Sequence, residues 1–205
     1  MGSSRRDHLV ATALALFCRQ GFRATGIDNV LRESGVAKKT LYNHFKSKDE
    51  LILAVLDKRG EDFLGLLRES VARLAPAQEG DPRMAPVLAF FDGLHEWIRG
   101  DDFNGCTFIN ASAEYPRPDD PVHLACADHK EQLVRLLQEL LADLQLQDAA
   151  AIARQLALLA DGAIVNAYTA GDQQSAMYAK AAAGELLKSY MVAQGQGAFR
   201  RKAPA

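Results

Sequence analysis

Hydrogen-bond donors gather in one short segment, GVAKKTLYNHFKSKDEL, which spans residues 35–51. A pair of adjacent lysines is followed at once by a polar run of Tyr, Asn and His. The donors are Lys38, Lys39, Thr40, Tyr42, Asn43 and His44. Side chains of these types bind the phosphates and the base edges of nucleic acids. The segment is therefore a candidate contact surface for a nucleic acid.

Two short helices joined by a tight turn are predicted to present these donors. The first helix runs to Gly35, and the second spans about residues 37–45. Leu41 and Phe45 lie at i and i+4 of the second helix and are predicted to face inward, which leaves the donors on its exposed sides. A helix, a turn containing glycine and a second helix are the elements of a helix-turn-helix, whose second helix enters the major groove.

Capping signals flank this pair of helices. Residues 47–50, Ser-Lys-Asp-Glu, form a capping box that begins a long helix, and Lys48 beside its free backbone N–H groups is predicted to bind a phosphate. Thr25 is predicted to cap the first short helix. Nearer the N-terminus, Arg5 and Arg6 form either an arm that reaches a minor groove or a mobile charged tail.

The charges of the chain are unevenly distributed. Residues 1–60 hold 11 Lys and Arg against 6 Asp and Glu, whereas residues 61–205 hold 13 against 20. The overall charge of −2 therefore conceals a basic N-terminal part and an acidic remainder. Either the charge is scattered at random over the surface, or only the N-terminal part binds a polyanion.

The run TGIDNVLRESGVAKKTLYNHFKSKDEL resembles the DNA-binding module of the TetR/AcrR family of one-component repressors over about residues 8–56. The shared features are a Thr before the second helix, Gly-Val at the turn, Thr-Leu-Tyr, a Phe, and Ser-Lys-Asp with a following Leu. The resemblance implies an N-terminal DNA-binding domain, a helical regulatory domain that binds a small-molecule inducer, and binding to a palindromic operator as a homodimer.

The resemblance also implies roles for the donors. Lys39 is predicted to read bases, with Lys38 and Thr40 either reading bases or holding nearby phosphates. Tyr42, His44 and Lys48 are predicted phosphate contacts, although a solvated surface face is the alternative for the first two. The predicted DNA-contacting set is Thr25, Lys38, Lys39, Thr40, Tyr42, Asn43, His44 and Lys48.

The sequence departs from the family pattern at three positions. Ala37 stands where the family usually has Ser or Thr, so the second short helix lacks a side-chain N-cap, a feature that contributes about 1 kcal/mol. Lys39 stands where Gly is common and adds a long donor. Gly26 replaces a Ser or Thr that often holds a phosphate, so this contact is expected to fall to Thr25 or to the backbone.

Beyond Gly60 the pattern stays helical, without β-type alternation. The expected fold is all-α with about nine helices. The expected domains are a helix-turn-helix domain over residues 1–50, a ligand-binding and dimerisation domain over residues 51–194, and a disordered tail over residues 195–205. Many small residues in the last two helices, with the resemblance, predict a four-helix homodimer interface, and ordinary packing within one chain is the alternative.

A ligand pocket is predicted where polar residues interrupt apolar helices. Asn110, Glu114 and His129 are expected to share a polar corner in a lining of aromatic residues. The lining comprises Phe90, Phe91, Trp97, Phe103 and Phe108. The alternative is a hydrogen-bonded core histidine with a capping carboxylate, and a three-ligand metal site is a further one. No cofactor is expected.

Other functional classes fit less well. HEWIR at residues 95–99 lacks the second His of a zinc-protease motif, and no glycine-rich phosphate loop is present, so an enzyme is not expected. A DNA-binding or architectural protein without a ligand switch is the main alternative. No run of about 18 uncharged apolar residues and no signal-peptide pattern appear, and three cysteines lack a CxxC spacing. A cytoplasmic protein that does not bind membranes is expected.

Overall fold

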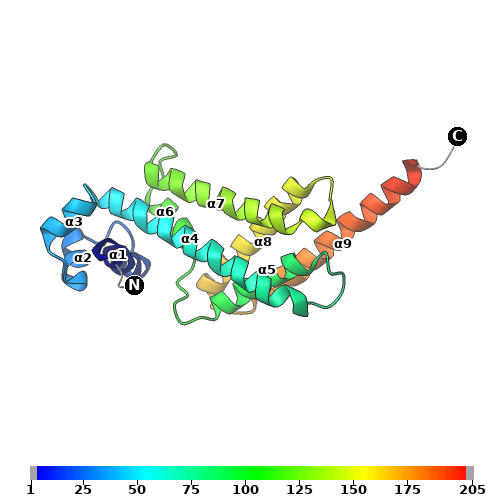
Figure 1. Cartoon of the computed structure of the whole chain (residues 1–205), viewed down its shortest axis with the longest axis horizontal. Helices are drawn as coiled ribbons and strands as arrows, with labels where there is room; N and C mark the ends of the chain where they lie inside the picture. Colours follow the sequence, from blue (N-terminus) through cyan, green and yellow to red (C-terminus); the bar gives the residue numbers. More distant parts are fainter. Residues whose placement is uncertain (1–3, 202–205) are drawn as a thin grey trace. The chain divides into compact units, whose positions relative to one another are not determined.

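Helices account for nearly all regular structure in the computed structural model, which describes residues 4–201 and the side chains of residues 4–193. The described part of the chain contains nine α-helices and two short 3-10 helices, shown in Figure 1, so the all-α prediction is confirmed. The helices are α1 Arg5–Gln20, α2 Ile27–Ser34, α3 Lys38–His44, α4 Lys48–Leu74, α5 Ala85–Ile98, α6 Thr107–Glu114, α7 Pro121–Leu140, α8 Ala149–Ala170 and α9 Ser175–Arg201; the 3-10 helices are Ala75–Ala77 and Ala142–Leu144.

The chain divides into two compact units. The first unit comprises the described residues up to Phe63 together with Cys106–Lys130, and the second comprises Leu64–Gly105 and the described residues from Glu131 onward. The start of α4 belongs to the core of the first unit, and the expected domain boundary at residue 50 stays a prediction. Leu51 and Val55 of α4 are fully buried in the same apolar cluster as α1 and α3.

Local capping determines where the helices of the first unit begin and end. Ser4 and Asp7 exchange side-chain and backbone hydrogen bonds in a capping box at the start of α1. Gly35 ends α2 with a left-handed φ of 65°, which a residue with a Cβ rarely adopts, and this makes the tight turn into α3. Ala37 provides no side-chain cap to α3, as expected. The helix-turn-helix therefore forms as the sequence predicted.

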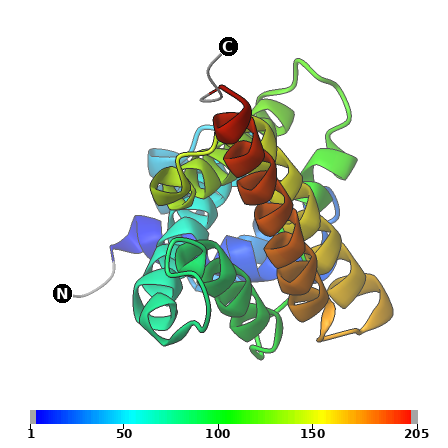
Figure 2. The ribbon, with the colours of Figure 1, turned by 90° about the vertical axis from the view of Figure 1, so that its right-hand side faces the viewer.

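The core of the second unit is built by α5, α8 and α9. In Figure 2, α8 and α9 lie side by side, and α5 also packs against α9. Gly171 joins α8 to α9 with a φ of 69°. Lys180 of α9 donates to both carboxylate oxygens of Asp92 on α5 at 2.7 Å, and the Gln78 side chain donates to the same carboxylate at 2.7 Å. These bonds connect three elements of the unit.

Helix α9 extends further than its sequence predicted. It continues past Gly195, where a disordered tail was predicted to begin, and ends at Arg201. The rest of the predicted tail, residues 202–205, lies outside the described residues.

Helix α8 has the length and apolar composition of a membrane-spanning helix, and it is the one helix of the described chain that does. It also carries Arg154, which forms hydrogen bonds of 2.8 and 3.0 Å with Glu131. Ile152, Leu156 and Ile164 of α8 are buried in the unit. A helix that packs against α5 and α9 in this way has the character of a protein core helix.

Candidate nucleic-acid interface and effector region

Helix α3 separates its apolar residues from its donors. Leu41 is fully buried and Phe45, just after the helix, is 3% exposed, so the prediction that both pack inward is confirmed. The donors lie on the remaining sides, with Lys38, Lys39, Asn43 and His44 exposed, Tyr42 45% exposed and Thr40 half-buried. The apolar side holds the helix in place while its other sides can reach a partner.

The two lysines of α3 differ in their surroundings. Lys38 lies 3.8 Å from Asp28 in an ion pair whose side chains are 66% and 90% exposed. A pair so exposed contributes little to stability, so a phosphate can replace Asp28 at small cost. Lys39 has no hydrogen-bond or ion-pair partner among the side chains that the structure describes. Its ammonium group is therefore free to bind another molecule.

Thr25 does not have the role that the sequence suggested. Its side chain is fully buried, and its hydroxyl donates a 2.8 Å hydrogen bond to the Gly21 carbonyl. The N-cap of α2 is Gly26, which makes no side-chain cap bond. The prediction of a Thr25 cap is wrong, because the hydroxyl closes the α1–α2 turn instead, and the predicted Thr25 phosphate contact stays a prediction.

Lys48 also serves the α1–α2 turn. Its Nζ donates a 3.0 Å hydrogen bond to the Arg23 carbonyl, and burial lowers its pKa. One donor of the Lys48 ammonium group therefore holds the turn, and its predicted phosphate contact stays a prediction. Lys46, which was not among the predicted DNA contacts, is exposed between α3 and α4. Its position between Phe45 and Ser47, in a run that also contains Lys48, was the sequence signal that could have marked it as a candidate phosphate contact.

Arg5 and Arg6 form neither an arm nor a mobile tail. Both belong to the first turn of α1, and the Arg6 guanidinium lies 5.4 Å from the centroid of the Phe45 ring. The Ser4 cap explains the difference, because it begins the helix just before these arginines.

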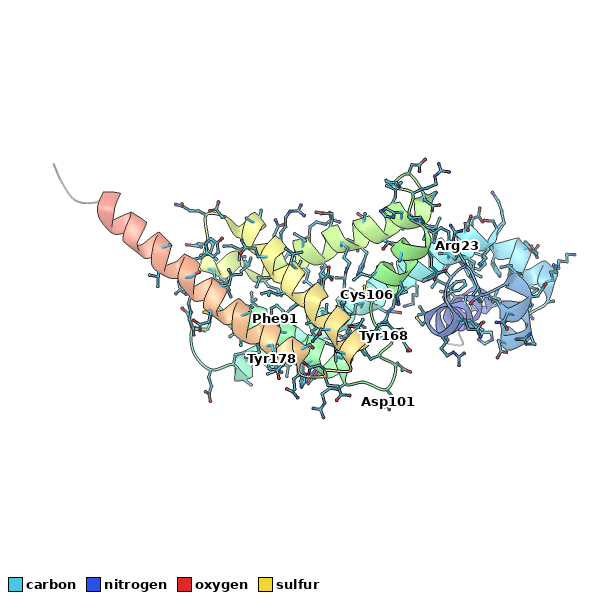
Figure 3. The ribbon with its side chains drawn as sticks, turned by 180° about the vertical axis from the view of Figure 1, so that it is seen from behind. Arg23, Phe91, Asp101, Cys106, Tyr168 and Tyr178 are labelled. Carbon is cyan, nitrogen blue, oxygen red and sulfur yellow. The ribbon has the colours of Figure 1, made fainter. Side chains whose placement is uncertain are left out.

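Glu114, the last residue of α6, holds the α1–α2 turn from the other side. One carboxylate oxygen accepts a 2.8 Å hydrogen bond from the Phe22 N–H, and the other accepts a 2.6 Å bond from the Arg23 N–H. The Arg23 guanidinium lies 5.1 Å from the centroid of the Tyr115 ring; Arg23 is labelled in Figure 3. We call Glu114 with these two N–H groups the Glu114 clamp. It joins α6 directly to the helix-turn-helix.

Comparison with known proteins identifies the family. The family model of bacterial regulatory proteins, tetR family, matches residues 9–55. The crystal structure of a TetR-family transcriptional regulator from Streptomyces coelicolor is 32% identical and covers 91% of this chain and 96% of its own, with a TM-score of 0.78. The chain belongs to the TetR family. It is accordingly a helix-turn-helix transcriptional regulator that binds DNA, and not an enzyme.

Curated relatives of this TetR-family regulator act in both directions. The transcriptional activator FasR of Mycolicibacterium smegmatis is 37% identical over 97 residues, which are 47% of this chain and 43% of FasR. The transcriptional repressor NemR of Escherichia coli is 26% identical over 109 residues, 53% of each chain. The chain thus spans about half the length of these two relatives, and the direction of regulation does not follow from them.

The six predicted ligand-binding residues of the TetR-family regulator fall in different units. Phe90 and Phe91 belong to the second unit, where both are fully buried and meet edge to face at 5.2 Å. Phe108, Asn110, Glu114 and His129 belong to the first unit. A shared lining formed by all six residues stays a prediction.

Within the first unit the predicted polar corner is divided. The Glu114 carboxylate is used by the clamp, which matches the alternative of a capping carboxylate. Asn110 is half-buried on α6. No group of three or more His, Cys, Asp or Glu side chains that could hold a metal ion occurs among the described residues. A ligand-binding role for Asn110 and His129 stays a prediction.

His129 is enclosed by apolar groups. It is 4% exposed, its ring stacks on Phe108 with centroids 3.5 Å apart, and Phe63 lies 6.1 Å away. A Cβ at Gly60 would come 3.1 Å from its Nδ1, which has no hydrogen-bond partner among the described residues. Burial lowers the pKa of His129 to about 4, so the ring is neutral at pH 7.

A small cavity of about 160 Å³ is lined in part by Cys126 and Lys130, which lie close to His129 in the sequence. It is smaller than ordinary drug-sized sites. The Lys130 ammonium lies 3.7 Å from the sulfur of Cys106, and burial raises the pKa of Cys126 to about 11. The thiol of Cys126 is therefore protonated at neutral pH and chemically inert.

A larger cavity lies in the second unit. It measures about 450 Å³ and is lined by residues of α4, of α5 and of the turn that follows α5, among them Trp97 and Phe103. We call it the α4–α5 cleft. Trp97 and Phe103 were both predicted to line a pocket, and the volume is that of a small-molecule site.

Proposed function

We propose that this chain is a ligand-responsive repressor that binds a palindromic operator as a homodimer and leaves it when a small molecule binds. The observation that carries the proposal is α3, whose buried Leu41 and Phe45 support a surface of exposed donors. A fixed helix with free donors can enter a major groove without rearrangement. Because this action is on DNA, we propose a cytoplasmic location.

The roles proposed for the donors follow from their surroundings. Lys39 reads bases, since its ammonium group has no partner among the described side chains. Lys38 and Thr40 read bases or hold adjacent phosphates. Tyr42, Asn43 and His44 contact the backbone along the flanks of α3, and Lys46 adds a phosphate contact beyond its end. Phosphate contacts fix the position of the helix, and base contacts supply sequence preference.

The dimer is proposed to form through α8 and α9. Leu158 is 71% exposed and Val165 41% exposed, and the two lie seven residues apart on one side of α8. On α9, Tyr178 is 65% exposed and Val192 59% exposed at positions that again share one side. Apolar side chains so exposed on neighbouring helices are typical of an interface, and a second copy would cover them.

The switch is proposed to act through α6. The Glu114 clamp ties the end of α6 to the backbone of the α1–α2 turn, so a shift of α6 displaces that turn and with it the helix-turn-helix. A ligand lowers operator affinity only to the extent that it prefers the displaced conformation. The reading residues themselves need not change.

Light scattering and a mobility-shift assay test the dimer. Half-sites read by a two-fold dimer lie about 34 to 36 Å apart, so the protein should protect a palindrome with that spacing. Leu158→Asp should give a monomer that binds the palindrome at least about a hundredfold more weakly, because one reading helix is lost. Glu79→Gln, an exposed position outside this surface, is the control. A monomeric wild type with tight operator binding would contradict the proposal.

Native mass spectrometry of the purified protein tests the ligand switch. A co-purified small molecule that releases the operator on addition supports induction. A DNA-binding protein without a switch remains the alternative function, and it predicts unchanged operator binding with every co-purified compound. Unchanged DNA and ligand binding after thorough chelation would exclude a metal from the switch.

A further inference from the structure

The α4–α5 cleft contains a hydroxyl group, that of Ser70, which a bound molecule can reach. Ser70 is only 6% exposed and lines the cleft, and its hydroxyl has no hydrogen-bond partner among the side chains and backbone that the structure describes. Buried hydroxyl groups nearly always have a partner. Opposite it, Gly93 approaches so closely that a Cβ there would lie 2.5 Å from the Ser70 Cβ. A polar atom of a bound molecule can therefore serve as the partner of the Ser70 hydroxyl.

An aromatic wall forms one side of the cleft. The Trp97 and Phe103 rings meet edge to face with centroids 4.9 Å apart, and Phe103 meets Tyr168 of α8 at 6.5 Å. Figure 3 labels Tyr168 on α8 and Asp101 in the turn after α5. A Cβ at Gly105 would lie 2.8 Å from the Tyr168 ring, so this glycine lets the ring approach the turn. Aromatic faces attract apolar groups and cations.

The charged residues of the cleft are mostly acidic. Its one basic residue, Arg73, forms a two-point pair with Glu96 at 3.2 and 2.5 Å, so the two charges offset each other. The carboxylates of Glu69, Asp101 and Asp102 also line the cleft and have no ion-pair partner among the described residues. Uncompensated carboxylates beside aromatic rings attract organic cations and repel anions.

We propose that the α4–α5 cleft binds an organic cation with an aromatic or other apolar body. The body lies against Trp97 and Phe103, the positive charge is held by the carboxylates of Asp101, Asp102 and Glu69, and Ser70 accepts a hydrogen bond when the cation carries an N–H. The cavity of about 450 Å³ has room for a ligand of this size. That this ligand is the effector rests on the function proposed above, whereas the binding site itself does not.

The fluorescence of Trp97, the only tryptophan of the chain, reports binding in the cleft directly. Tetraphenylphosphonium is the probe, and tetraphenylborate is its control of equal shape and opposite charge. The cation should quench the fluorescence to saturation, and calorimetry should give an affinity at least about tenfold higher for the cation than for the anion. Equal binding of both ions, or no saturable quenching by the cation, would overturn the proposal.

Variants locate the charge. Asp101→Asn with Asp102→Asn keeps the side-chain shapes and should weaken the cation about tenfold or more, and Glu69→Gln should weaken it less. Glu79→Gln, an exposed carboxylate of the same unit that does not line the cleft, should leave the affinity unchanged. Ser70→Ala should weaken 4-phenylbutylammonium a fewfold and leave tetraphenylphosphonium unaffected. Affinities unchanged in all cleft variants would refute the assignment.

Operator binding is measured separately. Release of DNA by the cation from wild type, but not from the Asp101→Asn, Asp102→Asn variant, supports both the site and its effector role. Saturable quenching with undisturbed operator binding supports the cation site and removes the effector role.

Discussion

Removal of the Glu114 carboxylate should loosen the helix-turn-helix without touching a DNA-contacting residue. Glu114→Ala deletes the acceptor of the Phe22 N–H and of the Arg23 N–H. A hydrogen bond to a charged group contributes about 1.5 to 3 kcal/mol. The Arg23 bond is exposed, so water replaces it, whereas the Phe22 bond is partly buried. We therefore expect the free energy of unfolding to fall by about 2 kcal/mol, close to the value of one such bond.

Two measurements follow from this value. For a chain of this length, about 2 kcal/mol corresponds to a melting temperature lower by about 4 to 8 °C, which calorimetry would detect. The freed turn must be ordered again on DNA, and ordering the backbone of one residue costs about 1 to 2 kcal/mol. This cost arises in each of the two subunits of the proposed dimer, so the operator Kd should rise about a hundredfold, with sequence preference unchanged.

Two variants serve as controls. Glu114→Gln keeps one side-chain oxygen as an acceptor, so it should retain about half of the stabilisation. Glu61→Ala removes an exposed carboxylate of the same unit and should change the free energy of unfolding by less than about 0.5 kcal/mol. If Glu114→Ala unfolds at the same urea concentration as Glu61→Ala, the clamp contributes no stability. If its operator affinity equals that of wild type, the clamp does not position the helix-turn-helix.

Three further predictions concern other parts of the molecule. Lys39→Ala should reduce discrimination at one base position by about 1 to 3 kcal/mol. Lys48→Ala should weaken binding to all DNA sequences alike, and it should also lower stability because the hydrogen bond to Arg23 is lost. The reverse pattern on a panel of operator variants would refute these roles. The His129 pKa of about 4 lies below its unfolded value of 6.5, so the unfolded chain binds more protons than the folded chain between these two pH values. The free energy of unfolding should therefore fall by about 3 kcal/mol as the pH drops from 6.5 to 4. Urea titrations should show this loss in wild type and not in His129→Phe. Gly93→Ala places a Cβ 2.5 Å from that of Ser70 and should lower the free energy of unfolding by about 1 to 3 kcal/mol, which an unchanged melting temperature would contradict.

The sequence by itself predicted the elements whose signals are local. The inward-facing Leu41 and Phe45, the end of α2 at Gly35 and the absent cap at Ala37 all follow from residue types within a few positions of one another. Helical periodicity and capping act over a few residues, so a short segment carries them in full. The family resemblance lay in the same segment, which made the helix-turn-helix and its exposed donors predictable.

Only the tertiary structure decided which polar groups are free and which are already bonded. Thr25, Lys48 and Glu114 all carry groups that can bind a ligand or DNA, yet each is bonded to the α1–α2 turn, and the partners of Glu114 lie 91 and 92 residues away in the sequence. The α4–α5 cleft likewise depends on the close approach of Gly93 to Ser70. Such pairings are invisible in residue spacing, because they arise from how helices pack and not from the order of residues along one helix.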